Sequence, residues 1–397
     1  MCNEHCLEVR RVIYTQGNLD SYEIFGISES ESMKRVSTSD LVPGMVTAED
    51  VYTFNNQLIL PRGLVLTDKS ITKLEFYSII TIRIEDGNDA EEDEVEVPTT
   101  LDADDNSSYS ERIKKSPEFI EFKKRFDEEI PKFKLLLEAA AEDKRPVNLD
   151  SMYDFAADLL QSDNGYLNVF DMLHNMRQYD DMTYAHSINV SLICNVFARW
   201  LHMSEEDTKM ATLCGLLHDI GKVSVPEEII TKPDRLTDSE FAIVKKHTLE
   251  GYNVLRRYPI PECIMNTALM HHERCDGTGY PFGITNSKID PYAKMVAIAD
   301  VYDAMTSARV YRGPMCPFAV IEIFENEGLQ KYDTQYIMTF LENIVNTYML
   351  HRVRLSDGRT GEVVFINRNH LSKPTIKSGS EFIDLTKCPG VTIEAII

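Results

Sequence analysis

Histidine and aspartate side chains that could hold metal ions gather in the middle of the sequence. Six of the ten histidines lie between residues 186 and 272. The candidate ligands are His186, His218 with the adjacent Asp219, His247, the pair His271-His272, and Asp300. Any one histidine alone would more often be an ordinary core residue. A set of imidazoles and carboxylates without thiolates, however, suits Fe, Mn or other transition ions in open catalytic sites better than a closed structural zinc site.

The number of candidate ligands indicates two metal ions. Seven side chains are too many for one ion and suit two ions if one carboxylate bridges them. Two metals about 3.5–4 Å apart can polarise a phosphoryl oxygen and stabilise the leaving oxygen of an in-line displacement. The set therefore predicts metal-assisted hydrolysis of a phosphoester.

The segments that carry these residues resemble a known family. GLLHDIGK at 215–222 resembles the signature of the HD superfamily of metal-dependent phosphohydrolases, and HHERCDGTGYP at 271–281 resembles the second signature of its HD-GYP branch. Three further segments match in the family's order: TYAHSINV at 183–190, VPEEIITKPDRLTDSEFAIVKKH at 225–247 and IADVYDAMTSARVYR at 298–312. The resemblance covers roughly residues 147–349 and implies an all-helical HD-GYP catalytic domain there.

The resemblance also implies how the ligands are shared between the two metals. The first metal would be held by His186, His218, Asp219 and Asp300, and the second by His247, His271 and His272, with Asp219 as the bridge. Some members bind a third ion through a Glu where this chain has Met182, so two divalent ions are expected, Fe or Mn. Asp219 would thereby also be a catalytic residue.

By the same resemblance, several side chains meet the substrate. Lys222 would face a phosphate oxygen and support catalysis, and Tyr280 would stack on a base, although Lys222 could be a surface lysine and Tyr280 could simply pack its loop. The other substrate-binding positions would be Gly277, Gly279, Arg309 and Arg312, with Lys232 and Arg235 adding positive charge nearby. The family more often has Gly at Asp234 and Pro at Val310, and these departures concern the choice of nucleotide rather than the metals.

Two acidic residues near the ligands are expected to orient them. Asp303 lies three residues after Asp300 on the same helical face, so it can hold a ligand histidine in place. Glu273 is expected to act in the same way.

The activity implied by the resemblance is hydrolysis of cyclic di-GMP, a bacterial second messenger, to pGpG, GMP or both. One alternative is a phosphodiesterase for another cyclic dinucleotide, such as 3′,3′-cyclic GMP-AMP. The other is a receptor that binds cyclic di-GMP without cutting it, although receptors of this kind usually lack metal ligands that are all present here.

The elements that position these residues belong to a multidomain, mainly α chain. After an N-terminal segment (1–35), residues 36–85 predict a small regulatory α+β module, with a helix near 68–77 and a strand at 79–84. Ten acidic residues between 86 and 105, without Lys or Arg, predict an acidic linker over 86–112. Linker helices (113–146), the catalytic domain (147–349) and a C-terminal β extension (350–397) follow; the extension is predicted to form a hairpin about Asp357-Gly358 and two short strands near 382 and 391.

An apolar face marks the linker helices. Phe119, Phe122, Phe126, Ile130, Phe133 and Leu137 recur at helical spacing, and Pro131 predicts a kink or two shorter helices. This face could pack on the catalytic domain or on a second copy of the chain. A homodimer through the linker helices or the N-terminal module therefore stays open.

Composition limits the possible partners. The chain has 397 residues, and its net charge of −23 repels nucleic-acid duplexes and anionic membranes. Eight scattered cysteines form no CxxC pair, so we expect reduced thiols in the cytoplasm. No apolar stretch is long enough to span a membrane, and the acidic residues near the N-terminus argue against a signal peptide.

Overall fold

The computed structural model of the protein describes most of the chain from residue 109 onward and parts of the chain before it. The described residues are 33–38, 41–52, 58–67, 70–71, 74, 81–85, 109–142, 147–160, 169–176, 182–232, 236–307 and 315–397. The chain forms two compact units, Met1–Val97 and Pro98–Ile397, which divide within the predicted acidic linker. Within the described ranges, no helix is both long enough and apolar enough to cross a bilayer.

The first unit contains short strands around a small core. The strands are β1 (Met33–Ser37), β2 (Val51–Tyr52), β3 (Leu58–Leu60) and β4 (Thr81–Glu85), paired antiparallel as β1 with β4 and β2 with β3. Apolar side chains of the strands and of the segment between β3 and β4, among them Ile82 and Leu66, are buried together. The predicted strand at 79–84 is found as β4, whereas the helix predicted near 68–77 lies largely outside the described residues.

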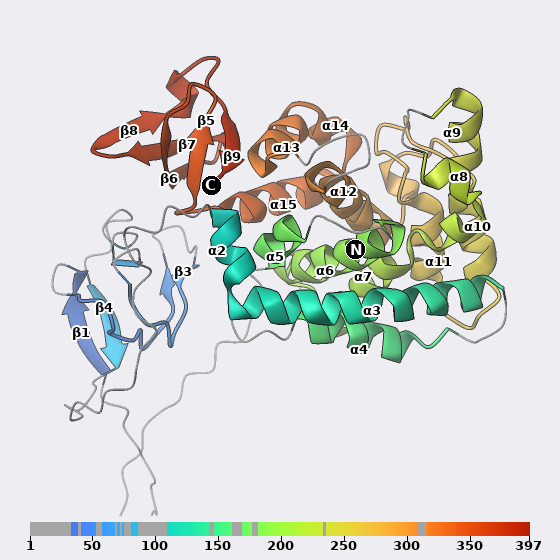
Figure 1. The fold of residues 1–397 in the computed structure, drawn as a ribbon, viewed down its shortest axis with the longest axis horizontal. Helices are drawn as coiled ribbons and strands as arrows, with labels where there is room; N and C mark the ends of the chain where they lie inside the picture. Colours follow the sequence, from blue (N-terminus) through green and yellow to red (C-terminus); the bar gives the residue numbers. More distant parts are fainter. Residues whose placement is uncertain are drawn as a thin grey trace, which may run out of the picture. The chain divides into compact units, whose positions relative to one another are not determined.

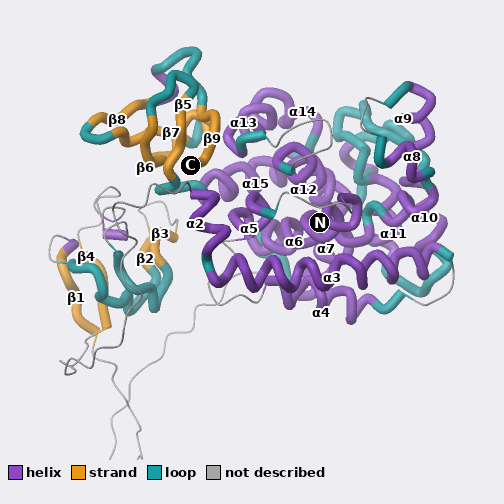
Figure 2. Tube along the Cα trace, viewed as in Figure 1, coloured by secondary structure: helices purple, strands orange, loops and turns teal. Residues whose placement is uncertain are grey.

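The second unit is mainly helical (Figures 1 and 2). Its helices are α2 (Tyr109–Lys115), α3 (Pro117–Ala141), α4 (Leu149–Leu160), α5 (Val169–Asn175), α6 (Met182–Trp200), α7 (Glu205–Leu217), α8 (Glu227–Ile230), α9 (Asp238–Val244), α10 (His247–Leu255), α11 (Glu262–Met270), α12 (Pro291–Thr306), α13 (Pro317–Ile323), α14 (Leu329–Lys331) and α15 (Thr334–Thr347). A 3₁₀ turn, Ile220–Ser224, follows α7, and a π-helical turn, Phe324–Gly328, joins α13 to α14. The helical pattern predicted for 147–349 is thus found in the residues that the structure describes.

Helix α3 buries the apolar face that the sequence predicts. Ser116 caps its N-terminus by accepting a hydrogen bond from the backbone N–H of Phe119, and the phenylalanine row faces the core of the same unit. The expectation of two shorter helices is wrong, because α3 runs through Pro131 without a break. Buried residues on both sides of Pro131, such as Ile130 and Phe133, hold the two halves in place, and this packing offsets the roughly 3 kcal/mol that an interior proline costs.

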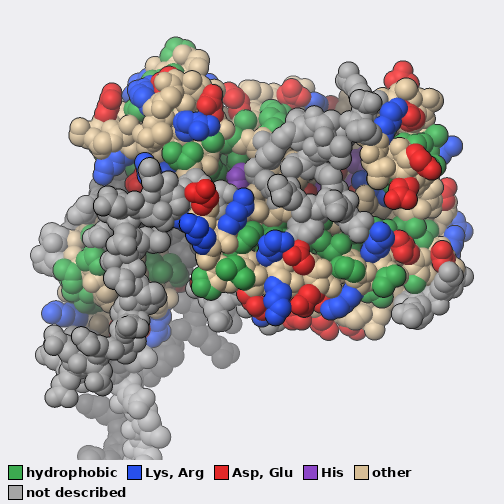
Figure 3. Space-filling view, viewed as in Figure 1, with side chains coloured by type: hydrophobic (Ala, Val, Ile, Leu, Met, Phe, Trp, Pro, Cys, Tyr) green, Lys and Arg blue, Asp and Glu red, His purple; other side chains and the backbone are tan. Residues whose placement is uncertain are grey.

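The opposite face of α3 is rich in charged side chains, with Ile120 and Leu135 exposed among them. Figure 3 shows Lys, Arg, Asp and Glu side chains along it, and ion pairs such as Lys123–Asp127 and Arg125–Glu121 link successive turns. Because the chain's own core already covers the phenylalanine row, that row is not a free surface for a second copy of the chain.

The C-terminal segment forms a five-stranded antiparallel sheet. Its strands are β5 (Arg352–Leu355), β6 (Thr360–Asn367), β7 (His370–Ser378), β8 (Glu381–Asp384) and β9 (Ile393–Ile396), in the order β8-β7-β6-β5-β9. The predicted hairpin is found as β5–β6, and β8 and β9 are the two short strands. The sequence prediction missed β7, which contains Pro374; this proline lies where the pairing with β6 shifts register, a position that tolerates a missing N–H.

The sheet packs against the helices. Glu325 accepts hydrogen bonds from the backbone N–H groups of Leu371 (2.5 Å) and Ser372 (3.0 Å), and β7 contacts α13 and α15. Val353 and Ile376 belong to the same buried cluster as the helical core. The sheet therefore covers part of the helical core.

Truncation of the phenylalanine row should show how much it stabilises the fold. We predict that Phe126→Ala, at a side chain with no exposed surface, lowers the free energy of unfolding by about 3 to 5 kcal/mol, because it leaves a cavity among packed rings. Urea unfolding measures this change. Leu135→Ala, on the exposed side of the same helix, is the control and should change it by less than about 0.5 kcal/mol. Equal effects of the two variants would contradict the packing described here.

Candidate metal centre

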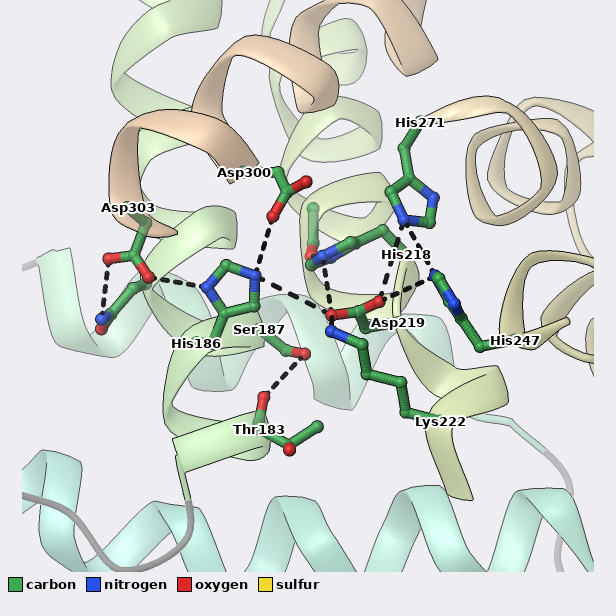
Figure 4. A network of polar contacts seen from close by, with 12 residues as sticks. Thr183, His186, Ser187, His218, Asp219, Lys222, His247, His271, Asp300 and Asp303 are labelled. Atoms are coloured by element: carbon green, nitrogen blue, oxygen red, sulfur yellow. Dashed lines mark hydrogen bonds and ion pairs between the residues drawn. The ribbon is translucent and has the colours of Figure 1, made fainter. Parts of the chain in front are cut away.

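Five helices bring the predicted metal ligands to one place. Helix α6 carries His186, α7 ends just before His218-Asp219, α10 begins with His247, α11 ends just before His271-His272, and α12 carries Asp300. The structure gathers all seven side chains, as Figure 4 shows for six of them. They form two groups: Asp219, His247, His271 and His272 in one, and His186, His218 and Asp300 in the other, with the ligand atoms of each group within 4.8 Å of one another.

Backbone carbonyls orient three of the histidines. The Nδ1 atoms of His218 and His247 lie 2.7 Å from the carbonyl oxygens of Gly215 and Val244, and that of His271 lies 3.1 Å from the carbonyl oxygen of Thr267. A carbonyl oxygen only accepts, so each Nδ1 must carry the proton and donate it. In the neutral ring, Nε2 then keeps a free lone pair, which is the form a metal binds.

These Nε2 atoms converge on the carboxylate of Asp219, which is 3% exposed. Its Oδ2 lies 3.2 Å from Nε2 of His218, and its Oδ1 lies 3.3 Å from Nε2 of His247 and 3.8 Å from Nε2 of His271. One oxygen of Asp219 therefore faces each group. Burial would raise the pKa of Asp219, but the neighbouring His218 and Lys222 hold it well below its usual range.

His186 lies between two carboxylates. Its Nδ1 is 2.7 Å from Oδ2 of Asp303 and its Nε2 is 3.0 Å from Oδ1 of Asp300 (Figure 4). Burial alone would lower the pKa of His186, but these two hydrogen bonds raise it to about 9. The other oxygen of Asp303 accepts hydrogen bonds from Asn189 Nδ2 (3.0 Å) and Ser307 Oγ (3.1 Å), so the carboxylate that holds His186 is itself fixed.

Asp300 also faces both groups. Its Oδ1 contacts His186, and its Oδ2 lies 3.7 Å from Nδ1 of His272. Asp300 is thus a second carboxylate, besides Asp219, with an oxygen toward each set of histidines.

The buried atoms at this centre fit divalent metal ions. Among the described residues, Nε2 of His218 and Oδ1 of Asp219 are buried without a hydrogen-bond partner, a state that is costly unless another ligand satisfies them. Burial lowers the pKa of His247 and His271 and lowers that of His272 to about 3, so these imidazoles are neutral near pH 7. Neutral imidazoles and carboxylates are the donor set of Fe, Mn and similar ions.

Two glycines allow the elements around the centre to approach closely. A Cβ on Gly221, in the turn after Asp219, would lie 2.0 Å from the carbonyl oxygen of His247. A Cβ on Gly279 would lie 2.5 Å from the carbonyl oxygen of His272. Gly279 therefore lets its own loop fold back on residues 272–274, whereas the sequence-based expectation placed it against the substrate; Gly277 contributes a positive φ of 81° to the same loop.

The remaining loop residues differ from expectation in part. The ring centre of Tyr280 lies 4.6 Å from that of His272, and the two rings are tilted by 30°. Glu273 is buried and accepts hydrogen bonds from the backbone N–H groups of Phe282 (2.7 Å) and Ile284 (3.1 Å), so it shapes the loop and does not orient a ligand histidine.

The predicted positive side chains have different surroundings. Lys222 Nζ lies 2.5 Å from Oδ2 of Asp219, at the centre itself. Lys232 is paired with Glu240 at 2.7 Å, so its charge is already neutralised. Arg235, Arg309 and Arg312 lie outside the described residues.

Sequence reasoning missed Asn189, which holds Asp303. Its signal was its position one helical turn after His186 in HSINV, which puts both side chains on the same face of α6.

The contact between Asp303 and His186 generates a prediction. Asp303→Asn removes the negative charge and leaves one acceptor oxygen where the carboxylate uses two, one toward His186 and the other toward Asn189 and Ser307, so the affinity for Mn²⁺ should fall by about 10- to 100-fold. Calorimetric titration of the metal-depleted protein with Mn²⁺ measures this. Asp154→Asn, at an exposed aspartate of α4, is the control and should bind as the wild type does. Unchanged affinity in Asp303→Asn would show that Asp303 does not position a ligand.

Comparisons with known proteins agree with this arrangement. A family model described as HD domain matches residues 169–336. A protein named cyclic di-GMP phosphodiesterase PA4108, from Pseudomonas aeruginosa, is 36% identical over 230 residues, which are 57% of this chain and 54% of that protein. A cyclic di-GMP phosphodiesterase of Thermotoga maritima is 36% identical over 177 residues, which are 44% of this chain and 48% of that protein. The 3′3′-cGAMP-specific phosphodiesterase 1 of Vibrio cholerae is 37% identical over 169 residues, which are 42% of this chain and 39% of that protein.

These matches are partial. The chain spans about half the length of the first of these relatives and less of the others. Among solved structures, the HDG"Y"P protein Bd1817 from Bdellovibrio bacteriovorus covers 79% of this chain and 99% of its own, at 18% identity and a TM-score of 0.42, a similarity too low to support a conclusion. The family match and the order of the motifs nevertheless agree: residues 169–336 of this chain match the HD domain family, and the GYP triplet at 279–281 resembles the signature of its HD-GYP branch.

Proposed function

We propose that this chain is a metal-dependent phosphodiesterase that hydrolyses cyclic di-GMP to pGpG, GMP or both. The observation that carries the proposal is the pair of ligand groups that share the carboxylate of Asp219. Two neighbouring sites of imidazole and carboxylate ligands are typical of enzymes that displace an oxygen at phosphorus.

The residues divide between the two ions as their contacts suggest. His186, His218 and Asp300 would hold one ion, His247, His271 and His272 the other, and Asp219 would contact both. Bound ions would supply charge that stabilises the transition state and would lower the pKa of a water molecule so that it can attack phosphorus.

The protein's own side chains would prepare the centre for this reaction. The carbonyl hydrogen bonds of His218, His247 and His271 keep their Nε2 atoms unprotonated, and Asp303 keeps His186 in place. The ammonium of Lys222, next to Asp219, would move from the carboxylate toward a phosphate oxygen of the substrate and stabilise its growing charge.

The choice of a cyclic dinucleotide as substrate follows the relatives. Two of the three relatives described above are named for cyclic di-GMP and one for 3′3′-cGAMP, at nearly equal identity. A phosphodiesterase for 3′,3′-cyclic GMP-AMP is therefore the second candidate. The intact ligand set argues against a receptor that binds without turnover. A cytoplasmic location and a homodimer stay predictions.

The proposal predicts that protein loaded with Fe(II) or Mn(II) without oxygen converts cyclic di-GMP to pGpG or GMP. His218→Ala removes a buried ligand and should reduce the rate by at least about 100-fold, whereas His370→Ala, at an exposed histidine of β7, should not change it. Chromatography of the products measures the rates of the wild type and of the two variants.

The alternatives give different results in the same assay. Preferential turnover of 3′,3′-cyclic GMP-AMP would favour the second candidate. Full metal loading without turnover of either compound would contradict the proposal and favour a receptor. Full activity of His218→Ala would contradict the role of the metal centre.

A further inference from the structure

A lysine and two aromatic rings lie together beside the metal centre, where α9 meets the loop after α11. Nζ of Lys245 lies 5.2 Å from the ring centre of Phe241 and 5.9 Å from that of Tyr280. The two rings are 6.3 Å apart and nearly perpendicular, at 80°. Lys245 and Phe241 are four residues apart, so one face of α9 presents both side chains to the loop.

Phe241 is the more accessible of the two rings. Tyr280 is partly buried and already packs against the ring of His272, whereas Phe241 is 45% exposed although it is large and apolar. A planar base that leaves water can therefore cover Phe241 at little cost. Stacking on an aromatic ring is how proteins hold unpaired bases.

Unlike Lys222 and Lys232, Lys245 is not neutralised by a carboxylate in the part of the chain that the structure describes. Lys222 is paired with Asp219 and Lys232 with Glu240, but Lys245 forms no ion pair with any carboxylate among the described residues. In a chain with a net charge of −23, a half-buried ammonium held over two rings without a carboxylate is available to a ligand.

The position of this group relative to the metals suggests which part of a ligand it meets. The ring of Tyr280 is a neighbour of both His272, 4.6 Å away between ring centres, and the ammonium of Lys245, 5.9 Å from its ring centre. A phosphate at the metal ligands would be next to Lys222, and a base attached to that nucleotide would extend past Tyr280. Lys245 thus lies where the base, and not the reacting phosphate, is expected.

We propose that Lys245 and Phe241 form the site that recognises one guanine base of the substrate; this rests on the function proposed above. Phe241 stacks on the base, and the ammonium of Lys245 donates to O6 and N7, which are both acceptors on guanine. Adenine carries an amino group in place of O6, and this donor faces the ammonium unfavourably. The pair therefore favours guanine over adenine.

The test is equilibrium binding to metal-depleted protein, which does not depend on turnover. Wild type should bind cyclic di-GMP about tenfold more tightly than cyclic di-AMP. Lys245→Met should weaken binding of cyclic di-GMP by about tenfold and bring the ratio of the two affinities close to one. Phe241→Ala should weaken both ligands by about tenfold without changing the ratio, because stacking does not distinguish purines.

Neighbouring residues provide matched controls. Lys246→Met removes a charge one position away, and Ile243→Ala removes an exposed apolar side chain from the same helix; both should bind as the wild type does. A contact of Lys245 with phosphate instead of base would weaken both ligands equally in Lys245→Met, and this unchanged ratio would overturn the proposal. Failure of wild type to bind cyclic di-GMP would overturn it as well.

The test of the guanine site can fail or succeed independently of the test of the proposed phosphodiesterase activity. Absence of catalysis would appear as lack of turnover by metal-loaded wild type, while the binding ratio of the metal-depleted protein would still report on Lys245. A retained preference for guanine in Lys245→Met alongside normal turnover would reject the recognition site and leave the phosphodiesterase in place.

Discussion

The buried carboxylate of Asp219 is the group on which the rest of the centre depends. An ionised carboxylate away from water is costly unless opposite charges or donors surround it. In this structure the ammonium of Lys222 supplies the opposite charge, and His218 and His247 lie beside the carboxylate; each of the three arrives from a helix end or the turn that follows one. Nδ1 of His218 and of His247 donates to a backbone carbonyl, so Nε2 of each ring points its lone pair toward the carboxylate of Asp219. A bound cation would remove the repulsion between these lone pairs and the carboxylate.

The fold supplies the rigidity that this arrangement needs. Helices α6 and α7 are buried along most of their length and pack closely on each other, so His186 and Asp219 have fixed backbones. Helix α3 on one side and the C-terminal sheet on another contribute to the same core. These elements carry no ligand, yet they determine how closely the ligand helices are held.

The sequence predicted well which candidate ligand side chains lie together, because their identity is local information. Adjacent pairs such as His218-Asp219 and a conspicuous loop at 279–281 can be read without knowledge of the fold. Side chains whose role depends on a contact with another segment of the folded chain were harder to predict. Glu273 stands beside His272 but faces the backbone of residues 282 and 284, and nothing in its neighbours along the chain indicates this.

Proline positions show the same limit for the fold. Pro131 predicted a kink or two shorter helices, but α3 is one helix through this proline, with buried side chains on both sides of it. Pro374 obscured a strand that the register shift with β6 accommodates. In both cases tertiary packing outweighs a local conformational preference.

The central claim, that Asp219 joins two ions, is tested most directly by electron paramagnetic resonance and metal analysis of Mn(II)-loaded protein. The account predicts two ions per chain with exchange-coupled spins. One ion per chain, or two ions without coupling, would contradict it.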